Sequence, residues 1–255
     1  MFRRTTAKID FSNLILKIGN EKIERIGKGC KTSFFKFVGI MLDEFLDWNS
    51  HIAHVSTKIS SGSYVLNTSK YFLPIQVRKN VYNALVRSHM EFGVLSWGNA
   101  LPGKLKRITA IQKKCMQNIA GKDIRSHTDP LYKKLNILKF HDLIQYNNIN
   151  FMHKLFLGKQ PGSFVDFFKK PPRFDSDTNR WKYCYSVDKL KNALVGRFPS
   201  AVLPRLWNMV DTETKILKSH SSFKKVIHES FLDLYVPNVK CRERLCPDCF
   251  SHCVK

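Results

Sequence analysis

Acidic residues are scarce in this sequence of 255 residues. It holds 20 Asp and Glu against 43 Lys and Arg, which leaves a formal net charge of +23 at pH 7. Residues 61–160 alone carry 16 Lys and Arg against 4 acidic residues. Such a charge exceeds what solubility requires and favours a polyanionic partner. The basic surface is expected on the middle of the chain.

Long apolar runs are also absent. No stretch approaches the roughly 18 apolar residues of a membrane span, and no apolar core follows the basic opening MFRRTTAKIDF as in a signal peptide. We therefore expect an intracellular protein, nuclear or cytoplasmic, that binds nucleic acid and no membrane. Gly-rich phosphate loops, G-x-S-x-G and H-E-x-x-H are missing too, so no complete active site can be argued.

Cysteine is unevenly distributed. Cys30, Cys115 and Cys184 stand alone, whereas four cysteines crowd into the last 15 of the 255 residues. We expect reduced thiols rather than a disulfide framework, because the total of 7 is odd.

The cysteine-rich tail, CRERLCPDCFSHC, offers the C-x2-C turn that presents two thiolates to one metal. Its spacing is tighter than in most zinc modules, so zinc and unligated thiols both remain open. The ligands of a zinc site would be Cys241, Cys246, Cys249 and Cys253, with His252 as a spare.

The N-terminal segment is expected to form a small antiparallel sheet. Strands 13–19 and 21–27 meet at Gly19 and Asn20, a pair typical of hairpin turns. The apolar segment 34–42 is predicted as one further strand. It leads into two adjacent carboxylates, Asp43 and Glu44, and such acidic pairs hold magnesium in polymerases.

From Trp48 onward the apolar period becomes helical. The predicted helices span residues 50–72, 73–92, 104–120, 139–157 and 221–236. Ser50 is the expected N-cap of the first, and Gly121 the expected end of the third.

Further details of these segments can be predicted from side-chain type. The apolar face expected for helix 73–92 comprises Val77, Val81, Ala84 and Leu85. Trp97 is expected to be a core anchor, and segment 197–208 a loop.

The predicted fold is α+β and mostly helical: a small antiparallel sheet at the N-terminus, a helical body and a C-terminal extension. Pro and Gly mark residues 161–180 as a linker. The expected domains are therefore 1–48, 49–160 and 161–255.

Several segments, in order and spacing, resemble the C-terminal part of the reverse transcriptase of jockey-like non-LTR retrotransposons. They are FFKFVGIMLDEFLDWNSHI, YFLPIQVRKNVYNALVRSHMEFGVLSWGN, IQKKCMQNIAG, HTDPLYKKLNILKFHDL, and LPRLWN followed by SFKKVI. The resemblance implies the end of a palm in 1–48, a helical thumb-like domain in 49–160 and a C-terminal extension.

The resemblance also implies a role for Asp43 and Glu44. In this family the strand K-F-V-G-I-x-L-D helps to hold the primer terminus, and the catalytic Tyr/Phe-x-Asp-Asp lies upstream of it. Residues 1–33 contain no such motif. We therefore expect no catalytic residue in this chain. An acid of this pair is expected to cap the turn before FLDW. Magnesium is expected only if an upstream palm is present.

A polymerase thumb grips nucleic acid through phosphates, which requires exposed Lys and Arg rather than a base-reading helix. The candidate contacts are Lys106, Arg107, Lys113, Lys114, Lys122, Lys133, Lys134 and Lys139. The expected partner is duplex or RNA–DNA hybrid, bound without sequence preference. The alternatives are a retained cellular protein whose helical body binds proteins, and a polymerase completed by a separate upstream polypeptide. Nothing in the sequence specifies an oligomeric state.

Overall fold

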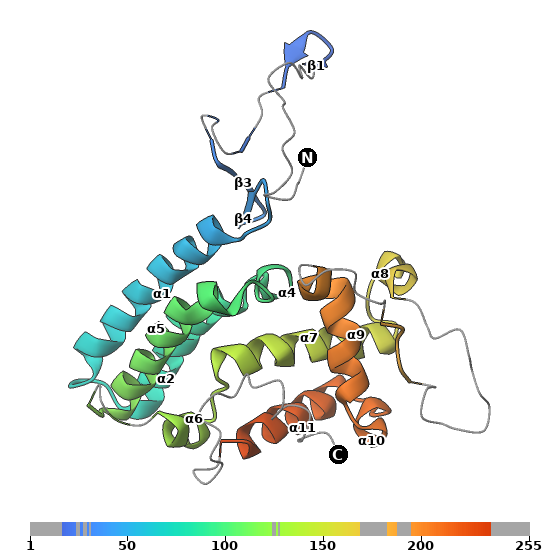
Figure 1. Cartoon of the computed structure of the whole chain (residues 1–255). Coiled ribbons are helices and arrows are strands. Elements are labelled where there is room, and N and C mark those ends of the chain that lie inside the picture. Colours follow the sequence, from blue (N-terminus) through green and yellow to red (C-terminus); the bar gives the residue numbers. More distant parts are fainter. Residues whose placement is uncertain are drawn as a thin grey trace.

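In the computed structural model of the protein, two small hairpins precede a body built of helices (Figure 1). The structure describes residues 17–23, 26–27, 30, 32–123, 126, 128–168, 183–187 and 195–235. The strands are β1 (Lys17–Ile18), β2 (Glu21–Lys22), β3 (Phe34–Phe37) and β4 (Ile40–Asp43).

The helices are α1 (Asn49–Ser69), α2 (Ile75–Tyr82), the π-helical turn η1 (Asn83–Arg87), α3 (Ser88–Glu91), α4 (Val94–Trp97), α5 (Pro102–Ala120), α6 (Asp129–Leu135), α7 (Phe140–Phe156), α8 (Gly162–Phe167), the 3₁₀ turn η2 (Val195–Arg197), α9 (Pro199–Met209), α10 (Thr212–Lys215) and α11 (His220–Asp233). The predicted class, α+β and mostly helical, is confirmed.

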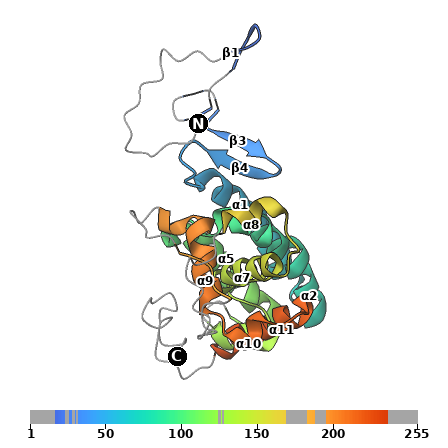
Figure 2. The ribbon, with the colours of Figure 1, turned by 90° about the vertical axis from the view of Figure 1, so that its right-hand side faces the viewer.

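Both hairpins are antiparallel. The first turns at Gly19, whose φ is 61°, as predicted. The prediction of one strand over 34–42 was wrong, because β3 and β4 reverse at Val38 and Gly39 with φ of 45° and 84°. Two consecutive positive φ values match the twist of a two-residue hairpin turn. In Figure 2 this second hairpin lies at the N-terminal end of α1.

Helix α1 packs along α5 (Figure 1). It begins after Trp48, which adopts a left-handed conformation, so the N-cap predicted at Ser50 was wrong. Gly62 allows close packing of α1 on η1: a Cβ there would lie 2.8 Å from Val86 Cγ2 and 2.9 Å from the Leu85 carbonyl oxygen.

The buried face of the segment α2–η1–α3 differs from the predicted one. Tyr82, Val86 and Met90, four residues apart, are fully buried, whereas Val77 and Leu85 are 41% and 39% exposed. The π-helical turn explains the difference, because its wider turn keeps residues at a spacing of four in line.

Helix α7 packs against α9 and α11. The loop predicted over 197–208 was wrong, because α9 forms despite two prolines. Pro199 occupies the first turn, where its missing N–H leaves no intrahelical bond unmade, and Leu203 and Trp207 are buried on one side. Segment 169–180 of the predicted linker lies outside the described residues.

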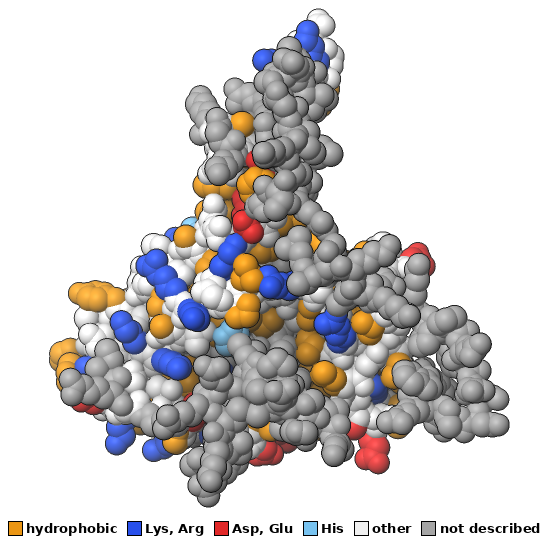
Figure 3. Space-filling view, viewed as in Figure 1, with side chains coloured by type: hydrophobic (Ala, Val, Ile, Leu, Met, Phe, Trp, Pro, Cys, Tyr) orange, Lys and Arg blue, Asp and Glu red, His pale blue; other side chains and the backbone are white. Residues whose placement is uncertain are grey.

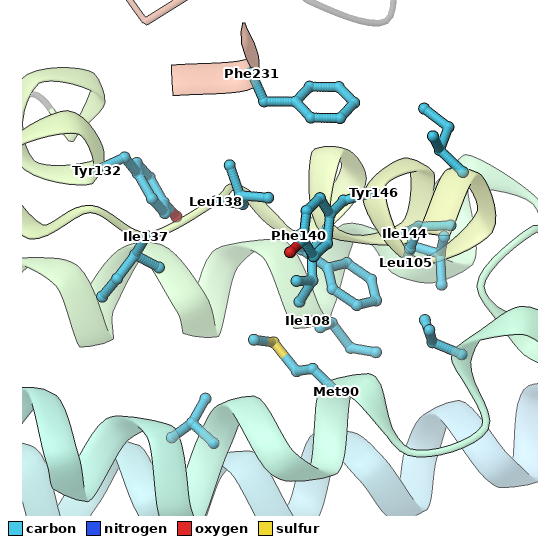
Figure 4. Packing of buried hydrophobic residues seen from close by; sticks show 14 of the residues in the cluster. Met90, Leu105, Ile108, Tyr132, Ile137, Leu138, Phe140, Ile144, Tyr146 and Phe231 are labelled. Carbon is cyan, nitrogen blue, oxygen red and sulfur yellow. The ribbon is translucent and has the colours of Figure 1, made fainter. Parts of the chain in front are cut away.

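Buried apolar side chains form one cluster that runs from Ile52 in α1 to Tyr235 after α11. Figure 4 shows its centre, where Met90, Ile108 and Phe140 from three helices point toward one another. Trp97 is fully buried, and its indole N–H donates to the carbonyl oxygen of Phe92 at 2.9 Å, as expected of a core anchor.

Candidate nucleic-acid interface

The acidic pair at the end of β4 has a structural role. Asp43 Oδ1 accepts hydrogen bonds from the backbone N–H of Phe45 at 3.2 Å and of Asp47 at 2.8 Å. These bonds cap the turn that leads into α1, as the sequence predicted. Glu44 is buried beside Gly27. A Cβ added at Gly27 would lie only 2.5 Å from the Oε2 atom of Glu44.

Helix α5 has sharply defined ends. Pro102 occupies its first turn, and the chain leaves it at Gly121 with a φ of 63°. Lys122 N–H returns to the carbonyl oxygen of Gln117 at 2.9 Å, a bond typical of a glycine C-cap. The predicted end of the helix is confirmed.

One side of α5 is buried and the other is basic. Leu105, Ile108, Cys115, Met116 and Ile119 are at most 2% exposed. At 100° per residue, the exposed Lys106, Arg107, Lys113 and Lys114 lie in two rows on the opposite side, within an arc of roughly 120°. Figure 3 shows Lys and Arg side chains gathered over α5 on this face of the molecule.

Gln112 fixes the inner side of α5, and sequence reasoning missed it. Its amide nitrogen donates to Tyr82 Oη at 3.0 Å and to the Leu138 carbonyl oxygen at 2.9 Å. Its amide oxygen accepts from Tyr132 Oη at 3.2 Å and from the Phe140 backbone N–H at 2.8 Å. No signal in the sequence pairs these residues, because they lie 20 to 30 positions away.

The remaining predicted contacts differ in their surroundings. Lys122, which follows α5, is exposed, and so are Lys133 and Lys134 on α6. The Nζ atom of Lys133 lies 3.4 Å from the Asp233 carboxylate. Lys139 is half-buried, and its Nζ lies 2.6 Å from Asp129 and 4.7 Å from the centre of the Tyr235 ring.

Lys139 therefore holds α6, α7 and the end of α11 together, and its ammonium faces the fold. The other predicted contacts point to solvent.

Acidic residues are scarce in the part of the sequence that forms α1 to α5. Between Asp47 and Asp123 the sequence holds 11 Lys and Arg and a single acid, Glu91. Glu91 Oε1 lies 3.0 Å from Arg87 Nη2 on the same stretch of helix. The field over α1, α2 and α5 is thus positive, which attracts polyanions.

Among the described residues, no three His, Cys, Asp or Glu side chains come together to hold a metal ion. Cys241, Cys246, Cys249, Cys253 and His252 lie outside the described residues, so the zinc site stays a prediction. Within the described ranges, no helix is long and apolar enough to cross a membrane.

The chain is 24% identical over 125 residues to the RNA-directed DNA polymerase from mobile element jockey of Drosophila melanogaster. It is a distant relative of that polymerase. The aligned region is 48% of this chain, and the chain spans only 14% of the length of its relative. No protein-family model and no solved structure matches the chain.

Proposed function

We propose that this chain is the nucleic-acid-gripping part of a reverse transcriptase of a mobile element. The proposal rests on helix α5. Its buried side is fixed in the core, and its exposed side carries Lys106, Arg107, Lys113 and Lys114. The distant relationship to the jockey polymerase supports it. In this assignment residues 1–48 end the palm, 49–160 form the thumb and 161–255 extend it.

The ligand proposed for this surface is duplex or RNA–DNA hybrid, bound through phosphates. Lysine and arginine attract phosphate whatever the base sequence, whereas sequence readout requires a helix that enters a groove with hydrogen-bonding side chains. The exposed side of α5 offers two rows of Lys and Arg with only Ala110 between them, a composition suited to phosphate contacts. Binding is therefore largely independent of sequence.

Polymerisation itself is assigned to an upstream palm. Asp43 caps a turn and Glu44 is buried in the fold, so neither is proposed as a magnesium ligand. Magnesium would enter with the palm, and zinc, if bound, would sit on the cysteine-rich tail.

Salt dependence tests the phosphate grip. Each neutralised phosphate of B-form duplex contributes a slope of about −0.9 in log K against log salt, so about five contacts predict a slope of about −4.5. Replacing Lys106, Arg107, Lys113 and Lys114 by Gln should reduce its magnitude by up to about 3.6. Fluorescence anisotropy with a labelled hybrid at several salt concentrations measures both slopes.

A matched control removes the same charge elsewhere. Lys154, Lys159, Lys224 and Lys225 are exposed on and beyond α7 and on α11, and replacing all four by Gln should change the slope by less than about 1. Equal losses in the two variants would show a diffuse charge effect and refute the α5 grip. Binding of the hybrid that ignores salt would refute the phosphate grip altogether.

A further inference from the structure

Three aromatic side chains are unusually exposed at one end of the helical body. Tyr64 lies in the last turns of α1, and Tyr71 and Phe72 lie in the turn between α1 and α2. Their exposed fractions are 69%, 78% and 84%. Figure 3 shows hydrophobic side chains protruding at the left end of the molecule, where α1 and α2 meet in Figure 1.

The local backbone aligns two of these rings. Tyr64 and Tyr71 are seven residues apart, and Lys70 continues the helical backbone beyond α1 with φ −60° and ψ −23°. Two turns of helix place such residues on one side, roughly 10 Å apart along the axis. Phe72 follows directly, held by its N–H to the Ser69 carbonyl oxygen at 3.1 Å.

The charge around the rings selects a polyanion. Lys70 Nζ lies 4.9 Å from the centre of the Tyr71 ring, so a cation stands at a ring face. The sequence from Trp48 to Met90 contains no acidic residue and holds Lys58, Lys70 and Lys79 among its basic residues. Lysines without acidic neighbours in the sequence favour an anionic ligand over a purely apolar one.

We propose that Tyr64, Tyr71 and Phe72 form a stacking platform for unpaired bases of single-stranded nucleic acid, with Lys70 on the adjacent phosphate. The inference rests on the proposed function in that nucleic acid is the ligand. It adds a second mode of contact, because bases in a duplex are already stacked and cannot pack on these rings. Aromatic platforms of this kind accept any base, since every base has a π-face.

The test separates bases from phosphates. An oligo(dT) of about a dozen nucleotides and an abasic strand of equal length carry the same phosphates, but only the first can stack. The protein should bind oligo(dT) roughly 5- to 150-fold more tightly for each ring engaged. The triple variant Tyr64→Leu, Tyr71→Leu, Phe72→Leu should lose this preference while its affinity for duplex is unchanged.

Two controls sharpen the result. Leucine keeps the surface apolar, so a protein-docking surface would survive the triple change; the pair Tyr64→Phe, Tyr71→Phe keeps the rings and should retain the preference for oligo(dT). Equal affinity of the protein for oligo(dT) and the abasic strand would overturn the platform, as would a leucine variant that keeps the preference.

Failure of the α5 grip gives a different pattern. In that case duplex binding does not respond to the α5 glutamine variant, while the preference for oligo(dT) over the abasic strand still reports on the rings alone.

Discussion

His153 in α7 and His220 in α11 form a pair of imidazoles that joins two helices 67 positions apart. Their Nδ1 atoms are 2.9 Å apart, and His153 Nε2 lies 2.9 Å from the Leu217 carbonyl oxygen. A neutral imidazole donates from one nitrogen only. Since Nε2 must donate to the carbonyl, Nδ1 of His153 accepts from His220, and protonation of His153 would remove that acceptor.

The surroundings of both rings favour the neutral form. Burial lowers the pKa of His153, with a smaller contribution from Lys159. Burial, and then the charges of His153, Lys154 and Lys224, lowers the pKa of His220 from 6.5 to about 4. The unfolded chain therefore binds more protons than the folded chain once the pH falls below about 6.5, and the free energy of unfolding falls as pH drops from there toward about 4.

We predict that the double change His153→Gln, His220→Gln flattens this dependence. Removing two groups with lowered pKa should reduce the proton uptake on unfolding by up to roughly two protons. Urea unfolding at several pH values between about 4 and 7 measures this pH dependence of the free energy of unfolding. His89→Gln, at an exposed position on α3, is the control. An unchanged slope in the double variant would contradict the prediction.

At the scale of the element, the joint between α5 and the start of α7 depends on Gln112. Its four hydrogen bonds connect α5 to Tyr82 in α2, to Tyr132 in α6 and to the backbone of Leu138 and Phe140. Its side chain is fully buried, so each partner left unpaired costs about 1–3 kcal/mol.

Gln112→Met, which keeps the volume and removes the bonds, leaves four partners unpaired and should lower the free energy of unfolding by about 4 kcal/mol or more. Gln76→Met on the exposed side of α2 should change it by less than about 0.5 kcal/mol. Urea titration of both variants gives the comparison, and a Gln112 variant as stable as the control would disprove the role of this joint.

The elements that the sequence predicts well are those in which one local rule dominates. The apolar stripe of α5 and its glycine end, and the hairpin turn at Gly19, were predictable from spacing and residue type. The face of α2–η1–α3 was not, because a π-helical turn changes the helical period. Helix α9 was missed because tertiary burial of Leu203 and Trp207 outweighs the preference of Pro204 for a break.

In the candidate site, too, some features could be predicted from the sequence and others could not. Exposure of Lys106, Arg107, Lys113 and Lys114 follows from the position of the apolar stripe, which the sequence contains. The inward position of Lys139 does not follow from the sequence, because it depends on Tyr235, 96 positions away. The Tyr235 hydroxyl accepts a hydrogen bond from the Lys139 backbone N–H at 2.9 Å. Contacts that span such distances require the packed fold.

At the scale of the whole molecule, one apolar cluster connects the helices on either side of residues 161–180. Phe140 and Leu155 of α7, Trp207 of α9 and Phe223 of α11 all belong to it. The basic side of α5 is therefore presented by a body whose last helices also support it. In the proposed function, nucleic acid would meet a preformed surface on α5, which would lower the entropy lost on binding.

Catalysis is a property of the whole molecule rather than of one element. Polymerases need anionic oxygens arranged around two magnesium ions, and here the Asp43 carboxylate already accepts two backbone N–H groups that hold the turn after β4. We expect no magnesium-dependent incorporation of nucleotides on a primed RNA template by this chain alone. Asp43→Asn keeps an oxygen that can cap the turn and removes the charge, so the variant should fold normally and bind hybrid as the unaltered chain does. Primer extension with both proteins is the measurement. Extension by the unaltered chain that is abolished in Asp43→Asn would give this carboxylate a catalytic role and overturn its assignment as a cap.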